Sequence, residues 1–214
     1  MWATSSLSGH VDIRFNILAH RDDTEDMEII PEVLFIADFW PEAPTLFVQL
    51  EQGTVWDTRL RARKTASFGV PYNYGRMVYS ETPLPEILLP LVEQLAQELG
   101  FVPNNCLINY YPDGNSTMGF HRDDTAGLVP ETGVAIISLG ASRTLVFRAT
   151  TNHERRVSFR LPSGSLLYMP PTVQDTWQHG VPEEHEATGG RISLTFRYVS
   201  AVPPGMPERS QGSL

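Results

Sequence analysis

The chain has 214 residues, of which 41% are hydrophobic and 19% are charged, and its net charge at pH 7 is −9. This length and composition predict one soluble domain with a buried core. The single cysteine, Cys106, excludes an internal disulfide framework and indicates a reducing compartment, so we expect a cytoplasmic or nuclear protein. Neither an apolar run of bilayer length nor a basic-then-apolar leader is present in the sequence, so we expect no membrane segment and no signal peptide.

The acidic side chains are concentrated at the start of the chain. Residues 1–51 contain ten acidic and two basic side chains, a balance of −8, whereas the remainder contains 15 acidic and 14 basic side chains, a balance of −1. Nucleic-acid-binding proteins usually carry an excess of basic residues. The absence of such an excess in this chain argues against a large contact area with duplex nucleic acid, but it does not exclude a small one. We expect residues 1–55 to form an acidic extension, loose over 1–28, that ends in a helix.

The first predicted elements lie between residues 33 and 63. Residues 33–36 form a short apolar run typical of a buried strand. Pro44 suits a first helical position, and the next apolar residues fall on one helical face: Leu46, Phe47 and Leu50. Residues 59–63 alternate arginine with Leu60 and Ala62. This alternation predicts a strand with three guanidinium groups on one face, those of Arg59, Arg61 and Arg63. The alternative for these arginines is a solvated edge strand.

Aromatic residues follow, interrupted by glycine and proline, which is typical of a loop or hairpin with exposed rings: Phe68, Tyr72 and Tyr74. For each ring, the alternative is that it only covers the mouth of the barrel. From Leu84 to Leu99 the apolar positions fit a helix that Gly100 ends. Pro90 lies inside this pattern, so we expect a kink or a late start of the helix there.

The chain beyond Gly100 changes to short strands separated by turn signals: Cys106–Tyr111, Val134–Leu139, Arg143–Arg148, Arg155–Leu161, Ser165–Met169 and Arg191–Val199. Many short strands after one or two helices predict an α+β, mainly β fold. We expect a double-stranded β-helix, or jelly roll, with the N-terminal helices packed on one sheet. Proline, glycine and serine dominate residues 201–214, which predicts a flexible tail.

A candidate metal site begins at His121 and Asp123. Residues two apart on an extended strand point to the same face, so this pair can present an imidazole beside a carboxylate. With a second histidine it would form the two-histidine, one-carboxylate set that holds non-haem Fe(II) and leaves positions open. His179 is the best candidate, because the other histidines lie in polar surroundings; His185 is its rival. His121, Asp123 and His179 are thus the expected metal ligands and catalytic centre.

Arg191 and Arg197 lie on a predicted strand on which they share one face with Ser193 and Thr195. Two arginines that face a β-barrel interior require an anion, and a dicarboxylate pairs with guanidinium groups in two-point contacts. The alternative is an edge strand with both arginines in solvent. Together with the metal motif, a 2-oxoglutarate site is the better interpretation. Asn109 and Tyr111, again two residues apart, add hydrogen-bond donors to the same expected pocket.

These motifs together resemble the AlkB-type Fe(II)/2-oxoglutarate-dependent dioxygenases, most closely the branch that dealkylates nucleic acids. The resemblance covers roughly residues 60–200 and rests on motifs in family order: Asn109-x-Tyr111, His121-x-Asp123-Asp124, Ser138-Leu139-Gly140-Ala141, Gly164-Ser165-Leu166-Leu167, Trp177-x-His179 and Arg191-x5-Arg197. It implies Fe(II) as the metal and 2-oxoglutarate and O₂ as co-substrates. Arg197 and Asn109 would bind the C1 end of 2-oxoglutarate, and Arg191 with Tyr111 its distal carboxylate, with Ser193 in the same pocket.

The activity implied by the resemblance is oxidative demethylation of N-alkylated nucleobases, of the 1-methyladenine and 3-methylcytosine type, in DNA or RNA, with release of formaldehyde, succinate and CO₂. The resemblance implies a substrate-recognition lid over 56–82 and a core of helix plus jelly roll over 83–200. We expect a monomer that takes a single-stranded or flipped base. The expected substrate contacts are Phe68, Tyr72, Tyr74, Arg59, Arg61, Arg63, Arg122, Asp124 and Thr125.

Two positions depart from the family pattern. Thr125 stands where many nucleic-acid members carry an acid that reads the damaged base, and Ser193 stands where asparagine is usual. Together with the acidic N-terminal segment, the departure at Thr125 leaves a second hypothesis open: a 2-oxoglutarate-dependent hydroxylase of a small molecule or a protein side chain. A non-enzymatic binding module on the same fold is a third hypothesis, which the filled metal and co-substrate positions disfavour.

Overall fold

The computed structural model describes residues 30–72 and 80–200. The expectations for residues 1–29 and 201–214, and the expected substrate contact Tyr74, lie outside the described residues. The described parts contain these elements in chain order: β1 (Leu34–Ile36), α1 (Ala43–Gly53), β2 (Lys64–Gly69), the 3₁₀ helix η1 (Glu86–Leu88), α2 (Leu89–Leu99), β3 (Asn105–Tyr111), β4 (Met118–His121), β5 (Val134–Gly140), β6 (Arg143–Ala149), β7 (Arg156–Leu161), β8 (Leu166–Met169), α3 (Pro171–Thr176), β9 (Trp177–Val181) and β10 (Arg191–Arg197).

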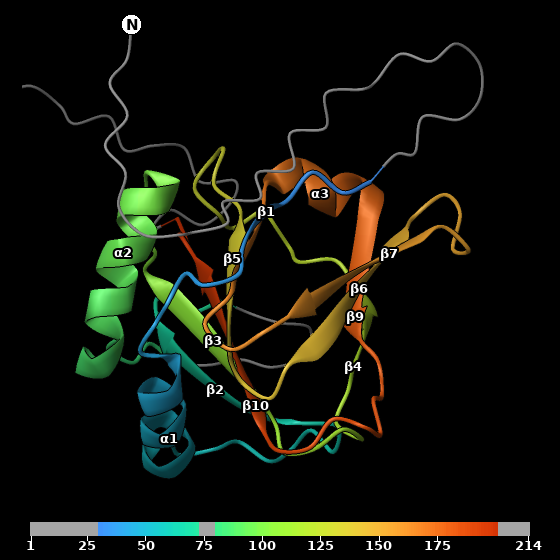
Figure 1. Ribbon diagram of the computed structural model, residues 1–214. Coiled ribbons are helices and arrows are strands. Elements are labelled where there is room, and N and C mark those ends of the chain that lie inside the picture. Colours follow the sequence, from blue (N-terminus) through green and yellow to red (C-terminus); the bar gives the residue numbers. More distant parts are fainter. Residues whose placement is uncertain (1–29, 73–79, 201–214) are drawn as a thin grey trace, which may run out of the picture.

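The strands form two antiparallel sheets that face each other. One has six strands in the order β1-β8-β5-β10-β3-β2, and the other has four in the order β4-β9-β6-β7. Helices α1 and α2 lie on the side of the six-stranded sheet that faces away from the four-stranded sheet (Figure 1). The expectation of a mainly β protein with helices on one sheet is therefore confirmed, and the six strands predicted beyond Gly100 appear within about two residues of their expected bounds.

The hydrophobic residues form two clusters, one on each side of the six-stranded sheet. The first joins α1 and α2 to the sheet through residues such as Leu46, Leu95 and Phe196. The second lies between the two sheets and includes Ile136 and Phe147. The six-stranded sheet is thus covered on both faces, which fixes which side chains of each strand point toward the helices and which point between the sheets.

The second helix begins late, as Pro90 predicted. α2 starts at Leu89 with Pro90 in its first turn, and the preceding Glu86–Leu88 form the 3₁₀ turn. Proline is tolerated there because the first N–H groups of a helix have no intrahelical acceptor. Gly100 ends the helix with φ of 77°, a left-handed conformation that glycine adopts without steric cost. None of the described helices is long and apolar enough to cross a bilayer.

The predicted strand over residues 59–63 is wrong. Asp57 forms a β-bridge with Thr65, with N···O distances of 2.8 and 3.0 Å, so the intervening residues close a loop and the strand begins only at Lys64. Asp57 also accepts hydrogen bonds from the backbone N–H and the guanidinium of Arg59, which stabilises the turn locally. The three arginines therefore do not share a strand face.

The predicted strand through His121 and Asp123 is also shorter than expected. β4 ends at His121, and its pairing with β9 shifts register between Met118 and His121. Asp123 consequently lies in an irregular segment after the strand. The strands β2 and β9 and the short helix α3 are elements that the periodicity of the sequence did not reveal, because runs of five or six residues carry little periodic signal.

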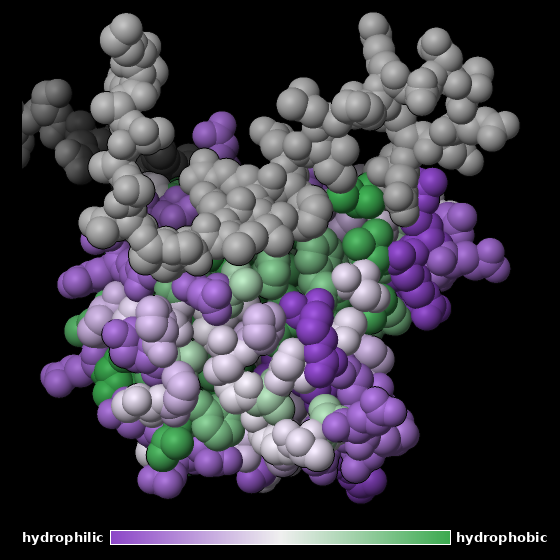
Figure 2. All heavy atoms as spheres, viewed as in Figure 1, coloured by the Kyte–Doolittle hydropathy of each residue, from purple (hydrophilic) through white to green (hydrophobic). Residues whose placement is uncertain are grey.

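The visible surface separates apolar from hydrophilic areas. Figure 2 shows small apolar areas over α1 and hydrophilic side chains along the edge formed by β7. Val48 in α1 is 46% exposed and Val55, just beyond the helix, is 93% exposed. On β7, the alternate residues Arg156, Ser158 and Arg160 are exposed, as expected for a strand with one solvated face.

Candidate active site

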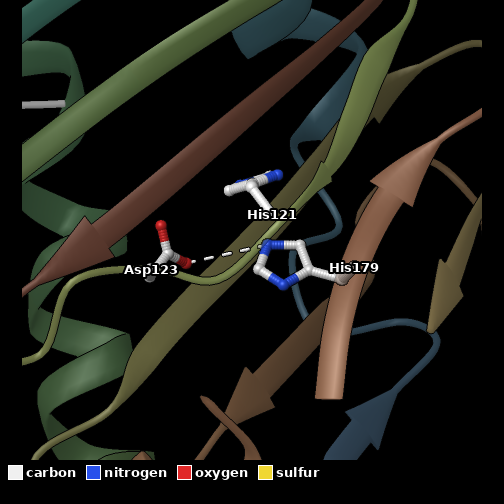
Figure 3. Close-up of side chains that lie close together, drawn as sticks. All are labelled: His121, Asp123 and His179. Atoms are coloured by element: carbon white, nitrogen blue, oxygen red, sulfur yellow. Dashed lines mark ion pairs between the residues drawn. The ribbon is translucent and has the colours of Figure 1, made fainter. Parts of the chain in front are cut away.

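The three predicted metal ligands meet between the two sheets. His121 at the end of β4 lies directly opposite His179 of β9, and their ring centroids are 4.3 Å apart. Asp123 Oδ2 lies 3.7 Å from His179 Nε2 (Figure 3). One ligand atom from each of the three residues lies within 4.8 Å of the other two. The neighbouring strands thus bring together residues that are 58 positions apart in the sequence.

Two of the three ligands, His121 and Asp123, are oriented by contacts outside the triad. His121 Nδ1 lies 2.9 Å from the carbonyl oxygen of Gly119, so Nε2 is the ring nitrogen that would coordinate a metal. The backbone N–H of Asp123 donates to Gln174 Oε1 at 2.9 Å. Arg197 Nη2 donates to Asp123 Oδ1 at 2.8 Å, so the other carboxylate oxygen remains directed at His179.

The protonation states of Asp123 and His179 favour metal binding. Burial alone would raise the pKa of Asp123, but the charges of Arg197, His179 and His121 outweigh it and lower the pKa to about 2. Burial lowers the pKa of His179 to about 4, and the attraction of Asp123 offsets only part of that shift. At neutral pH the site therefore holds an ionised carboxylate and a neutral imidazole, the forms that coordinate metals.

The donor set fits Fe(II). Two imidazoles and one carboxylate on one side of an ion are the ligands typical of non-haem Fe(II) oxygenases, and they leave coordination positions for other molecules. Asp123 Oδ2 and His179 Nδ1 are buried without a hydrogen-bond partner among the described residues. A buried polar atom without a partner costs free energy, and a metal ion on Asp123 Oδ2 would remove that cost for the carboxylate.

The predicted co-substrate residues line the same cavity as the metal ligands. The cavity wall includes all five of them: Asn109, Tyr111, Arg191, Ser193 and Arg197. The strand β10 that carries Arg191 and Arg197 lies between β3 and β5, and both side chains are 1% exposed. A solvated edge strand is therefore excluded. Ile192, Leu194 and Phe196 of the same strand pack toward the helices, as the alternation predicted.

Arg191 is held for an anion that the described residues do not supply. Its Nη2 donates to Ser138 Oγ at 2.8 Å, its guanidinium carbon lies 5.2 Å from the centre of the Tyr111 ring, and its Nε and Nη1 have no partner among the described residues. Burial lowers the pKa of Arg191, whereas the charge of Asp123 keeps that of Arg197 raised despite burial. The unpaired donors of Arg191 fit a carboxylate.

The expected substrate residues do not form one group. Tyr72 is buried near the metal ligands: its hydroxyl donates to the carbonyl oxygen of Asp124 at 2.7 Å, and its ring lies 4.2 Å from the Arg197 guanidinium carbon. Burial raises the pKa of Tyr72 to about 12, so it stays a hydrogen-bond donor. Phe68 instead packs against the cluster on the helix side of the sheet and does not line the cavity of the metal ligands.

The arginines and the residues after Asp123 also occupy different environments. Arg59 pairs with Asp57 at the surface, and Arg61 is exposed. Arg63 turns inward and donates to Asn109. Arg122 and Asp124 are exposed, and Thr125 is half-buried with its carbonyl oxygen accepting from Leu128 N–H. Asp124 Oδ1 accepts from Ala126 N–H, so this segment is a tight turn beside the metal site.

Sequence reasoning missed several residues that organise the site. Gln174 of α3 holds the backbone of Asp123, and Ser138 of β5 holds Arg191. Arg143, 1% exposed, donates to the carbonyl oxygens of Asp113, Ser116 and Pro182 and so joins two loops at the cavity rim. In the sequence, Ser138 belongs to a family motif that gives it no role. Arg143 lies on the same strand face as Leu145 and Phe147, a pattern that indicates an inward-facing arginine. No local signal singles out Gln174.

The comparison with family models identifies the class of protein. The model described as the 2OG-Fe(II) oxygenase superfamily matches residues 19–197, and the chain belongs to this superfamily. The similar curated proteins place it among the AlkB-type members. In this family the metal is Fe(II) and 2-oxoglutarate is the co-substrate, which agrees with the His121, Asp123 and His179 arrangement.

Two curated relatives illustrate the likeness. The alpha-ketoglutarate-dependent dioxygenase alkB homolog 3 of Rattus norvegicus is 32% identical over 193 residues, which cover 81% of this chain and 65% of that protein. The DNA oxidative demethylase ALKBH2 of Homo sapiens is 32% identical over 180 residues, which cover 74% of this chain and 69% of that protein. The chain therefore spans about two thirds of the length of these relatives.

A solved structure supports the fold independently. The structure of OsALKBH1 superimposes with a TM-score of 0.61 and covers 79% of this chain and 99% of that chain. The sequence identity is 18%, so this similarity concerns the arrangement of the backbone. The backbone arrangement described above is therefore similar to that of OsALKBH1.

Proposed function

We propose that this protein is an Fe(II)- and 2-oxoglutarate-dependent dioxygenase that oxidatively demethylates N-alkylated bases, of the 1-methyladenine and 3-methylcytosine type, in DNA or RNA. The observation that carries the proposal is the cavity in which the His121, Asp123 and His179 triad meets two buried arginines on one strand. The products are formaldehyde, succinate and CO₂. The names of the curated relatives support the nucleic-acid substrate, since they include a DNA oxidative demethylase.

Each residue has a defined part in this proposal. His121, Asp123 and His179 hold Fe(II). Arg197 and Asn109 bind the C1 end of 2-oxoglutarate, and Arg191, Tyr111 and Ser193 lie at its distal carboxylate. Bound Fe(II) and 2-oxoglutarate together activate O₂ for hydroxylation of a substrate C–H bond. The protein orients these groups and, by burying them between two sheets, keeps bulk water away from the reacting centre.

The substrate is proposed to approach where the 56–82 segment and the turn after Asp123 meet. Tyr72 joins these two segments through its hydrogen bond to Asp124, so both border the metal site. Arg122 lies in the sequence between the metal ligands His121 and Asp123. It is exposed, so it can contact a phosphate. We therefore retain residues 56–82 as the recognition lid and Asp124 and Thr125 as contacts of the base, while Phe68 contributes to packing.

The fold type, the domain bounds, the oligomeric state and the cellular location of the protein are part of the same proposal. The strand orders β8-β5-β10-β3 and β4-β9-β6-β7 support a double-stranded β-helix. In each sheet, strands from the first half of the core (β3 to β6) alternate with strands from its second half (β7 to β10), as in that fold. We propose residues 83–200 as the catalytic core of a single domain that acts as a monomer in the cytoplasm or nucleus. A monomer elutes in gel filtration at the 24.0 kDa of the chain; elution at twice that mass would contradict this part of the proposal.

The direct test is incubation of the protein with Fe(II), 2-oxoglutarate and a single-stranded oligonucleotide that carries 1-methyladenine or 3-methylcytosine. Mass spectrometry should show loss of the methyl group together with succinate formation. The His121→Ala variant, which lacks one metal ligand, is the blank. Succinate formation without any change in the oligonucleotide would overturn the nucleic-acid substrate and leave the dioxygenase chemistry in place.

A second function is favoured by one observation at the base-reading position. Thr125 carries no charge and its carbonyl oxygen is used within a turn, so this residue supplies no carboxylate to a cationic damaged base. A hydroxylase of a small molecule or a protein side chain fits this position equally well. If candidate metabolites or peptides stimulate succinate formation and methylated oligonucleotides do not, this second function replaces the first.

A further inference from the structure

Arg63 makes a contact that differs from those of the other two arginines in its segment. Its Nε donates to Asn109 Oδ1 at 2.8 Å, across 46 residues of sequence. Asn109 is 1% exposed and lies in β3, where it pairs with Thr65 of β2 on one side and Ser193 of β10 on the other. Arg63 is half-buried and directly precedes β2, the strand at one edge of the six-stranded sheet, so it reaches Asn109 in the cavity wall from that edge.

This contact decides which way the asparagine amide faces. A side-chain amide has an acceptor oxygen on one side and a donor NH₂ group on the other. With its oxygen turned to the Arg63 N–H, the amide keeps its NH₂ group for the opposite side. The reversed amide would set an N–H donor against the N–H donor of Arg63, which is repulsive. A guanidinium has only N–H donors and no acceptor, so it cannot pair with the NH₂ group of the reversed amide.

The geometry points to Arg63 as a positioning residue for co-substrate binding, an inference that rests on the proposed 2-oxoglutarate site. By accepting from Arg63, Asn109 presents its NH₂ group to the cavity that it shares with Arg197. There it donates to the C1 carboxylate of 2-oxoglutarate. With the amide reversed, the oxygen of Asn109 would face that carboxylate and repel it. Arg63 thus supports the co-substrate without touching it.

The inference changes the role expected for the arginine segment. Arg59 is engaged with Asp57 and Arg61 is exposed, so these two remain candidates for phosphate contacts. Arg63 instead joins the segment before the proposed lid to the co-substrate end of the cavity. A readout on 2-oxoglutarate affinity therefore separates the two roles, because a phosphate contact acts on oligonucleotide affinity and its salt dependence.

The test measures 2-oxoglutarate binding by calorimetry to the full-length Fe(II)-loaded protein without oxygen. The Arg63→Ala variant should bind 2-oxoglutarate about tenfold more weakly, the usual effect of losing one hydrogen bond to a charged group. Arg63→Lys, which keeps a donor and the charge, should recover part of that loss. Arg61→Ala, two residues away and exposed, is the matched control and should bind like the wild type.

A second variant tests the orientation of the amide directly. Asn109→Asp keeps the shape and the contact with Arg63 but turns a carboxylate oxygen toward the cavity, so 2-oxoglutarate binding should fall further than in Arg63→Ala. In turnover, Arg63→Ala should raise KM for 2-oxoglutarate more than it lowers kcat, with Fe(II) content unchanged. This split is not expected from a general loss of structure, which circular dichroism and Tm would reveal.

The outcomes distinguish this inference from the proposed function. Equal 2-oxoglutarate affinity in Arg63→Ala and Arg61→Ala would overturn the positioning role. So would a variant that loses only oligonucleotide affinity, since that result assigns Arg63 to phosphate. If Arg63→Ala does not fold, equal affinities of Arg63→Lys, Asn109→Asp and wild type overturn the inference instead. A wild-type protein that binds Fe(II) but no 2-oxoglutarate would overturn both the co-substrate site and this inference.

Discussion

At the scale of single residues, the site depends on pairing charges that burial would otherwise penalise. Arg197 and Asp123 are 1% and 5% exposed, and their 2.8 Å contact satisfies one oxygen of a carboxylate that has been removed from water. Oδ2 of the same carboxylate is left for the metal. One arginine therefore stabilises a metal ligand while its guanidinium lies at the end of the cavity proposed for the C1 carboxylate of 2-oxoglutarate.

Replacing Arg197 with alanine should separate metal binding from co-substrate binding. The variant loses the proposed two-point contact with 2-oxoglutarate, so its affinity for 2-oxoglutarate should fall by about 100-fold or more, while Fe(II) still binds His121, Asp123 and His179. Calorimetry and metal analysis of the purified variant measure the two effects. Arg191→Ala is the matched control, because it loses the distal contact and keeps the Arg197–Asp123 pair. Loss of iron from Arg197→Ala alone would show that Arg197 mainly holds Asp123.

The buried imidazole of His179 should make the metal-free protein sensitive to acid. Its pKa is about 4 in the folded protein against 6.5 in the unfolded chain, so the unfolded chain binds the proton more readily. This contribution to stability is complete above about pH 6.5 and is lost as pH falls toward about 4. In His179→Gln, which does not titrate, Tm should fall less over this range than in wild type. Parallel curves of Tm against pH would contradict the prediction.

At the scale of elements, the pairing of two strands, β10 and β4, with their neighbours positions the residues of the site. β10 lies between β3 and β5, so its alternate residues face the cavity while the others reach the helices. β4 pairs with β9, so His121 faces His179. The short helix α3 precedes β9 directly, and its Gln174 holds the segment after β4. One side chain therefore links the two chain segments that carry the metal ligands.

Gln174→Leu should weaken metal binding through this link. The substitution preserves most of the side-chain volume but leaves the buried N–H of Asp123 without its acceptor, a cost of about 1–3 kcal/mol in positioning the carboxylate. Fe(II) affinity should therefore fall by about tenfold. Titration with Fe(II) or Mn(II) measures the effect. Asp175→Asn, an exposed neighbour in the same helix, should bind metal like the wild type. Unchanged affinity in Gln174→Leu would mean that the turn itself fixes Asp123.

At the scale of the molecule, the six-stranded sheet carries a hydrophobic cluster on each face, and the site lies on the face that the second sheet covers. His121 and His179 meet only when β4 pairs with β9 in the four-stranded sheet, and Asp123 is held by Arg197 of the six-stranded sheet. The unfolded chain has no such arrangement, so a metal that binds the site must stabilise the folded state.

Fe(II) or Mn(II) should therefore raise the Tm of the protein, and a chelator should reverse the effect. At a free metal concentration of about 100 times Kd the gain is about 2.7 kcal/mol, which corresponds to about 5–10 °C for a domain of this size. Differential scanning calorimetry with and without metal measures the shift. His121→Ala should show little or no shift, and an equal shift in that variant would place the stabilising metal elsewhere.

The local patterns of the sequence determined the chemistry of this protein. Alternation with period two is a property of any strand, so it predicted that Arg191 and Arg197 share a face before their partners were known. The spacing of His121 and Asp123 and the late start of the second helix at Pro90 are equally local. In the structure, the first pair joins His179 in a group that could hold a metal ion, and Pro90 lies in the first turn of α2.

Only the tertiary structure decided which face of each strand borders the cavity and which residues close around it. Phe68 turns to the helices because β2 pairs with β3 in a register that places its ring there, and that register depends on residues 36 positions or more away. Arg63 meets Asn109, and Gln174 meets Asp123, for the same reason. Contacts between residues far apart in the sequence depend on packing, and a short side-chain pattern does not indicate which distant residue it will contact.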